Sequence, residues 1–184
     1  LKGQVNETGY AEYLAALRPV YVALEKVEAE LADHPVVGTM IDQGLQRVSA
    51  IEADLAHWAP EGVPAFHSDA VDAYVTRIEE TVKNPIEFVA HHYTRYLGDL
   101  SGGQAIGALL GRAFGITDGA GLTMYRFDAI AKPKPYKDGY RARLDNLAVN
   151  ADEQSQIVNE VRVAFRLNSA LFIELGRNLE RYQR

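Results

Sequence analysis

Hydrophobic positions recur every three to four residues along most of this chain, which is the period of an α-helix. The pattern predicts helices over residues 8–33, 42–58, 68–83, 84–115, 134–147 and 150–182. In the first of them the apolar stripe consists of Leu14, Leu17, Tyr21, Leu24, Val27 and Leu31. No stretch alternates apolar and polar residues as a half-buried strand does. The sequence therefore predicts an all-α fold, a single-domain multi-helix bundle.

Several residues mark where these helices should begin. The candidate N-caps, whose side chains can accept backbone N–H bonds, are Thr8, Ser68, Asn84 and Asn150. Pro85 suits a first helical position because its missing N–H would be unbonded there. Pro19 falls inside the first helix, where it should kink the helix or remove one hydrogen bond. The inner stripe predicted for the last helix is Val158, Val161, Phe165, Asn168, Phe172, Leu175 and Leu179.

Glycines interrupt the helical pattern of residues 84–115. Gly98, Gly102 and Gly103 each cost a helix about 1 kcal/mol relative to Ala, a large sum beside a net stability of about 5–15 kcal/mol. Gly98 and Gly102 are four residues apart, so they share a helix face on which the backbone is accessible. Either a crossing helix packs there, which the spacing alone favours, or a planar ligand binds and the backbone bends at the glycines.

Charged side chains near this stretch have two interpretations. Asp99 lies between the glycines with Ser101 close by, and a carboxylate there could be the polar group of an apolar pocket. It could equally form a solvated pair with Arg95 one turn earlier. Lys137 and Arg141 share a helix face and could hold a pair of carboxylates. On the residues alone, a solvated charged face is the favoured interpretation of the two cations.

Composition narrows the classes of function. The 184 residues are 47% hydrophobic and 24% charged, as in an ordinary globular domain, and the net charge of −6 argues against nucleic acid as a partner. Cysteine is absent, which fits a reducing cytoplasm, and no apolar run approaches the roughly 18–20 residues of a membrane span. The five histidines show no zinc-site spacing. We expect His91 to be a hydrogen-bonded core residue and His92 to be partly exposed.

The run Val-Ala-His-His-Tyr-Thr-Arg-Tyr-Leu-Gly-Asp-Leu-Ser-Gly-Gly-Gln, residues 89–104, resembles the distal helix of the heme oxygenases. Residues 100–104 also spell the signature loop of ATP-binding-cassette ATPases. Those domains need a Gly-Lys phosphate loop, and this sequence contains no Gly-Lys pair. The resemblance to heme oxygenases covers nearly the whole chain. It implies a heme-oxygenase-like bundle whose distal helix is kinked at the glycines.

The resemblance also implies roles for matching residues. Asp99 is expected to organise distal water, Arg95 to join that water network, and Tyr21 to hydrogen-bond Asp99. The expected heme contacts are Gly98, Gly102 and Gly103 over the ring face, Ser101 beside them, Tyr93, Lys137 and Arg141 at the propionates, and Phe165, Asn168 and Phe172 in the distal pocket.

In this family heme is both substrate and cofactor. It is cleaved to biliverdin, carbon monoxide and ferrous iron with O₂ and electrons from a reductase or ferredoxin. The resemblance therefore implies a monomeric, cytoplasmic heme-degrading oxygenase of the monooxygenase type, without nucleic-acid or membrane partners. A non-catalytic heme carrier on the same scaffold is the alternative. The thiamin-pyrimidine hydrolases share the architecture, but their cysteine chemistry does not suit this cysteine-free chain.

One departure concerns the iron ligand. The family holds iron with a proximal histidine on its first helix, and Lys2-Gly3-Gln4-Val5 aligns just after that helix. None of the five histidines matches the proximal position, so this chain is expected to hold no metal ligand of its own. We expect the ligand upstream of Leu1, with residues 1–184 forming a heme oxygenase domain that lacks the proximal helix.

Overall fold

The structure, a computed structural model, describes residues 5–63 and 67–183. The α-helices are α1 (Glu7–Glu30), α2 (Val48–Trp58), α3 (Asp69–Glu80), α4 (Pro85–His92), α5 (Gln104–Phe114), α6 (Pro133–Asp145), α7 (Ala151–Gly176) and α8 (Leu179–Tyr182). Short 3₁₀ turns lie at Val37–Thr39, Gln43–Leu45, Thr81–Lys83 and Thr123–Tyr125. No strand occurs in the described ranges, where Val5 and Gln183 form one isolated bridge. The all-α prediction is confirmed.

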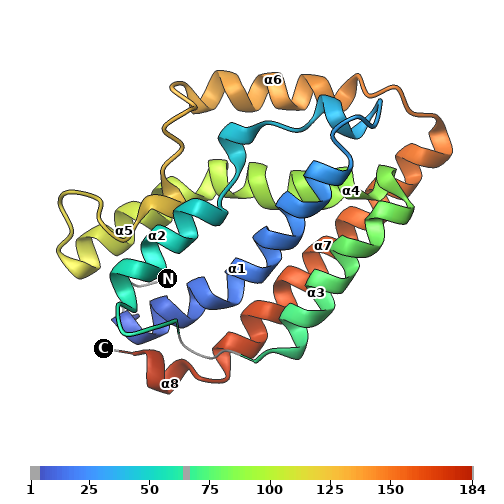
Figure 1. Ribbon diagram of the computed structural model, residues 1–184. Helices are drawn as coiled ribbons and strands as arrows, with labels where there is room; N and C mark the ends of the chain where they lie inside the picture. Colours follow the sequence, from blue (N-terminus) through green and yellow to red (C-terminus); the bar gives the residue numbers. More distant parts are fainter. Residues whose placement is uncertain (1–4, 64–66, 184) are drawn as a thin grey trace.

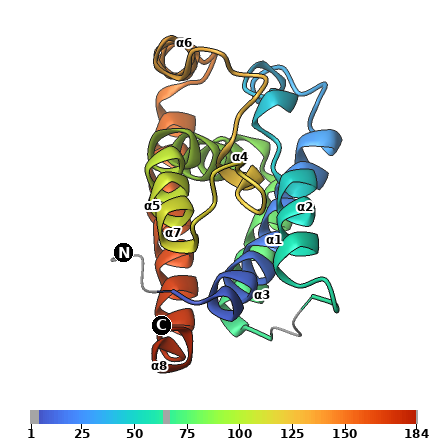
Figure 2. The same ribbon diagram turned by 90° about the vertical axis from the view of Figure 1, so that its left-hand side faces the viewer.

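The helices form two sides of a bundle. Helix α1 packs between α2 and α3, while α4 and α3 both pack against α7 (Figure 1). Helix α6 lies across one end of the bundle (Figure 2). The stripe predicted for α1 is confirmed as core: Leu14, Leu17, Tyr21 and Leu24 are each 0% exposed, and the helix runs on through Pro19. Within the described ranges no helix combines the length and apolar character needed to cross a bilayer.

Two helix starts differ from the prediction. Asn6, not Thr8, caps α1, because its side chain accepts the N–H of Gly9 at 2.8 Å. Helix α2 begins at Val48 rather than residue 42. The carboxylate of Glu25, on α1, accepts the backbone N–H groups of Arg47 and Val48 at 2.7 and 2.8 Å. A side chain from another helix thus caps α2, which local sequence cannot reveal.

Of the remaining predicted caps, two are confirmed and one is wrong. Ser68 caps α3 through the N–H of Val71, and Asn150 forms a capping box with Glu153 at the start of α7, so both predictions are confirmed. Asn84 precedes α4 but makes no side-chain cap bond, so its predicted capping role is wrong.

The last predicted helix is divided and rotated. Helix α7 ends at Gly176, and a separate turn forms α8. On its predicted inner stripe Val158, Phe165, Phe172 and Leu179 are 46–55% exposed, so that prediction is wrong for these four residues. Leu175 of the predicted stripe is buried, as expected, but the other buried positions are Glu160, Ala164 and Leu171. Because the charged Glu160 lies on the buried face, the hydrophobic pattern of the sequence did not identify that face.

Glu160 is buried because Arg77 and His91 hydrogen-bond its carboxylate. His91 Nε2 lies 2.8 Å from its Oε1, and Arg77 donates to both carboxylate oxygens at 2.8 and 2.6 Å. Burial alone would raise the pKa of Glu160, but these hydrogen bonds lower the pKa to about 2. The cluster joins α3, α4 and α7, and so fixes the helix that leads into the glycine-rich stretch.

Candidate functional site

Between α4 and α5 the chain stays helical but changes its hydrogen-bond pattern. Tyr93–Leu97 and Asp99–Gly103 are π-helical segments, separated by Gly98. A π-helix bonds residue i to i+5, is rare, and occurs mostly as single turns that are frequent at functional sites. The sequence predicted an unusual backbone at these glycines, and the structure shows widened turns there.

The glycines of this stretch divide into two sets. A Cβ added at Gly103 would lie 3.2 Å from Tyr125 Cδ1, and one at Gly107 would lie 3.0 Å from Tyr125 Cβ. Those two glycines allow a close crossing with the segment that follows α5. A Cβ added at Gly98 or Gly102 meets no atom within 4 Å. The crossing predicted as one alternative at Gly98 and Gly102 is thus absent there, and a close contact occurs at Gly103 and Gly107 instead. The ligand alternative for Gly98 and Gly102 and a heme contact by Gly103 stay predictions.

A hydrogen-bonded network lies beside Gly98. The Tyr21 hydroxyl donates to Asp99 Oδ2. Arg95 Nη2 donates to that hydroxyl at 2.6 Å, and Arg95 Nη1 donates to Asn168 Oδ1 at 2.6 Å. The predicted pairing of Tyr21 with Asp99 is thus present. The Arg95 and Asp99 side chains are 8% and 17% exposed and 3.5 Å apart, so they are not the solvated pair that local spacing allowed.

Burial shapes the electrostatics of this network. Burial raises the pKa of the Asp99 carboxyl, and this effect outweighs the opposite pull of Arg95 and of the Tyr21 hydrogen bond. Burial likewise raises the pKa of Tyr21 well above its usual value, so its hydroxyl keeps the proton that it donates. Burial works against the charge of Arg95, but the phenol and carboxylate beside it leave its pKa raised. The Asp99 side chain is therefore hydrogen-bonded and partly exposed, and it binds a proton at a higher pH than an ordinary aspartate.

Aromatic side chains of α7 lie on the same helix face as Asn168. Phe165 and Phe172 are 54% and 46% exposed, and Phe172 stacks on Tyr13 with ring centroids 6.0 Å apart. Asn168 stands between them on the helix and bonds Arg95. The apolar stripe that the sequence assigned to the core thus borders the polar network.

The predicted cations lie on α6, which packs against the π-helical segment 99–103. Lys137 is half-buried, whereas Arg141 is exposed and pairs with Asp138 at 3.3 Å. Tyr93 is half-buried, and Ser101 is exposed on the same π-helical stretch as Asp99. The structure thus brings α6 to the glycine stretch, although the two are remote in sequence.

A comparison of the whole chain with known protein families agrees with this architecture. The family model described as heme oxygenase matches residues 1–174. This chain belongs to the heme oxygenase family.

Relatives and solved structures of heme oxygenases match nearly the full chain. Heme oxygenase 1 of Nostoc is 37% identical over 185 residues, which cover 97% of this chain and 76% of that protein. Heme oxygenase 1 of Pongo abelii is 37% identical and covers 95% of this chain, which spans only 62% of that protein. The crystal structure of heme oxygenase-1 from Synechocystis in complex with heme superposes with a TM-score of 0.90 at 34% identity, covering 98% of this chain and 82% of that one.

Two histidines of this heme oxygenase directly precede the π-helical stretch. His91 is fully buried and hydrogen-bonded, as predicted. His92 is also 0% exposed, so its predicted partial exposure is wrong. Lys2, Gly3 and Gln4, on which the alignment with the proximal helix rests, lie outside the described residues.

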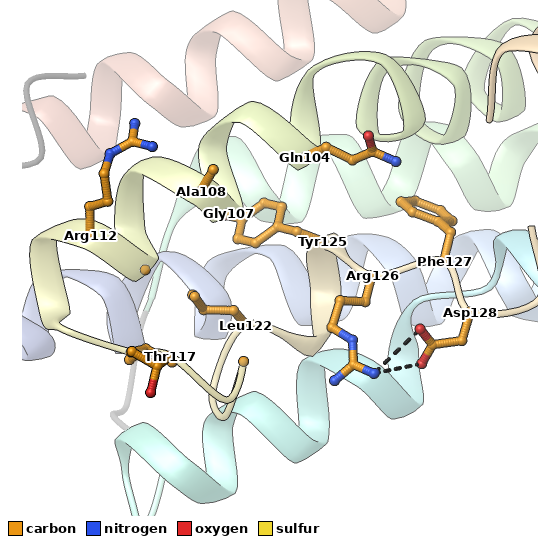
Figure 3. A pocket seen from close by; sticks show the side chains of 13 residues that line it. Gln104, Gly107, Ala108, Arg112, Thr117, Leu122, Tyr125, Arg126, Phe127 and Asp128 are labelled. Carbon is orange, nitrogen blue, oxygen red and sulfur yellow. Dashed lines mark hydrogen bonds and ion pairs between the residues drawn. The ribbon is translucent and has the colours of Figure 1, made fainter. Parts of the chain in front are cut away.

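Two cavities adjoin α5, the helix that follows the π-helical stretch. One, of about 510 Å³, lies between α5 and residues 116–128 and is bordered by Gln104, Arg112 and the Arg126–Asp128 ion pair (Figure 3). The other, of about 440 Å³, is lined mainly by apolar groups and reaches Phe172 and Tyr13. Sequence reasoning did not include this second cavity, although Ile106, Leu109 and Leu110 form a helical apolar stripe that could have indicated it.

Proposed function

We propose that this heme oxygenase cleaves heme to biliverdin, carbon monoxide and ferrous iron, with O₂ and electrons from a reductase or ferredoxin. The observation that carries the proposal is the open backbone at Gly98 and Gly102 with the Asp99 carboxyl between them. Backbone without Cβ atoms lets a flat macrocycle approach, and a carboxyl at its edge can hold water over the ring. Family membership indicates heme as the macrocycle.

The residues present fit heme as a substrate. Gly98 and Gly102 offer a surface for the ring face, and Phe165 and Phe172 offer partly exposed apolar surface nearby. Lys137 and Arg141 can pair with the two propionates, with Tyr93 as a further donor. When bound, heme supplies the iron that binds O₂ and the carbon that is oxidised.

The role proposed for Asp99 is to hold water and deliver protons at the open face. The Tyr21 hydroxyl holds one carboxylate oxygen of Asp99, and Arg95 Nη2 lies 3.5 Å from the other, so both neighbours restrain the side chain. Water-mediated hydrogen bonds are nearly as favourable as direct ones, and a network strengthens its members. Because the pKa of Asp99 is raised, the carboxyl can take up and release a proton closer to neutral pH than an ordinary aspartate.

Asn168 completes the network from α7. Its carbonyl oxygen accepts from Arg95, which holds the guanidinium between α7 and Tyr21. The arginine thus stabilises the Asp99 carboxylate from behind, and the carboxyl rather than the cation reaches the open face. This arrangement matters, because a cation that donated a hydrogen bond directly to the reacting dioxygen would favour cleavage of the O–O bond over attack on the ring.

A reconstituted reaction tests the activity. The protein, with heme bound, is given O₂ and a ferredoxin or reductase system while the Soret band is followed. Loss of that band with growth of a biliverdin absorbance, and carbon monoxide in equal amount, is the expected result. A Soret band that persists unchanged would show a heme carrier instead.

A further inference from the structure

One side chain dominates the buried face of α6, with Tyr136 and Leu144 partly buried beside it. Of the thirteen residues of α6, Tyr140 alone is buried, and it is 0% exposed. A helix with so small a buried face gains little from hydrophobic packing. Whatever holds Tyr140 therefore also sets where the neighbouring Lys137 and Arg141 lie.

Tyr140 meets His92, at the end of α4. Its hydroxyl lies 2.8 Å from His92 Nδ1, and the two rings stack with centroids 5.8 Å apart and planes 10° apart. His92 is itself 0% exposed and directly precedes the π-helical stretch. One hydrogen bond thus joins the helix that carries the cations to the helix that carries Gly98 and Gly102.

On its other side the His92 ring faces Glu28 of α1, but Nε2 makes no hydrogen bond there. Its Nε2 lies 3.4 Å from Oε1 of Glu28, which is 1% exposed, and the other Glu28 oxygen accepts from Gln46 Nε2 at 3.1 Å. Burial, reinforced by Arg143, lowers the pKa of His92 to about 3, so its ring is neutral at pH 7. Burial raises the pKa of Glu28 to about 7, so the group that faces Nε2 is only partly ionised at neutral pH. With the ring proton on Nε2, Nδ1 accepts from the Tyr140 hydroxyl.

We propose that His92 is a positioning residue that fixes α6 through Tyr140 and thereby selects which meso carbon of heme is cleaved. The inference rests on the proposed function. Heme would be located by two surfaces, the glycine face against its ring and the α6 cations at its propionates. Because four meso carbons exchange places as the ring turns in its plane, a shift of α6 changes the carbon presented beside Asp99.

Tyr140→Phe tests this, since it removes the hydroxyl and keeps the stacked ring. Tyr136→Phe is the matched control: it also deletes a tyrosine hydroxyl from α6, but one that donates at 2.7 Å to Asp42, outside the distal helix. The readouts are the biliverdin isomer ratio after a single turnover and the heme-methyl NMR shifts of the heme complex before turnover. Neither readout changes when a substitution only lowers stability.

The expected result is a change of about fivefold in the isomer ratio for Tyr140→Phe, the effect of one net hydrogen bond, and a wild-type ratio for Tyr136→Phe. His92→Ala should change the ratio in the same direction. An unchanged ratio in Tyr140→Phe, or an equal change in Tyr136→Phe, overturns the proposal. If the wild-type protein forms no biliverdin, the proposed function fails instead, and the NMR shifts still report whether the hydroxyl orients heme.

Discussion

Gly98→Ala should make the heme-free protein more stable and at the same time a weaker heme binder. Gly98 has φ −61° and ψ −49°, angles that any residue adopts, and an added Cβ would meet no atom within 4 Å. Replacing a helical glycine by alanine then gains about 1 kcal/mol. For a chain of this length the gain corresponds to a rise of about 2–4 °C in the melting temperature.

The same methyl group should hinder heme. It would project into the space that a macrocycle needs in order to lie against the backbone, and overpacking of one methyl-sized group costs about 1–3 kcal/mol. Heme affinity should therefore fall by about 5- to 150-fold. Stability and binding move in opposite directions only if the open face exists for a ligand.

Gly107→Ala is the matched control on the same helical stretch. Its Cβ would lie 3.0 Å from Tyr125 Cβ, and Tyr125 is 6% exposed, so the neighbour has little room to move. This variant should lose stability and keep its heme affinity. Thermal unfolding followed by circular dichroism and heme titration at the Soret band measure both quantities. A lower melting temperature for Gly98→Ala, or an unchanged heme affinity, would refute the assignment of the open face.

Three further predictions follow from the site and its supports. Asp99→Ala should keep heme binding, lose biliverdin formation and gain peroxidase-like turnover; an unchanged biliverdin yield removes Asp99 from the mechanism. Lys137→Glu and Arg141→Glu should weaken heme affinity or mix the biliverdin isomers, and an unchanged titration and product profile would exclude the propionate assignment. For Glu160, whose folded pKa of about 2 lies below the usual 4.5, the stability is present above pH 4.5 and is lost as the pH falls through 2. Since that difference is worth about 3 kcal/mol, Glu160→Gln should lose that amount at pH 7 and much less near pH 2 in denaturant titrations.

Local sequence determined most of the helices, because hydrophobic period and caps such as Ser68 and the Asn150–Glu153 box act within a few residues. The sequence also revealed the unusual glycines within a helical pattern, because their cost in helix stability follows from residue type alone. It could not place the start of α2, which Glu25 caps from α1. It assigned the wrong face of α7 to the core, because a buried Glu160 is tolerable only when Arg77 and His91 arrive from other helices.

Only the tertiary structure separated the glycines by role. Gly103 and Gly107 have the same chemistry as Gly98 and Gly102, but Tyr125 packs on the first pair and nothing packs on the second. Periodicity describes one helix at a time and carries no information on what stands opposite each face. The sequence alone thus determined that the backbone is bare at these positions and that an acid lies among them. What the bare face meets depends on contacts between residues far apart in the chain, and those exist only once the helices are assembled.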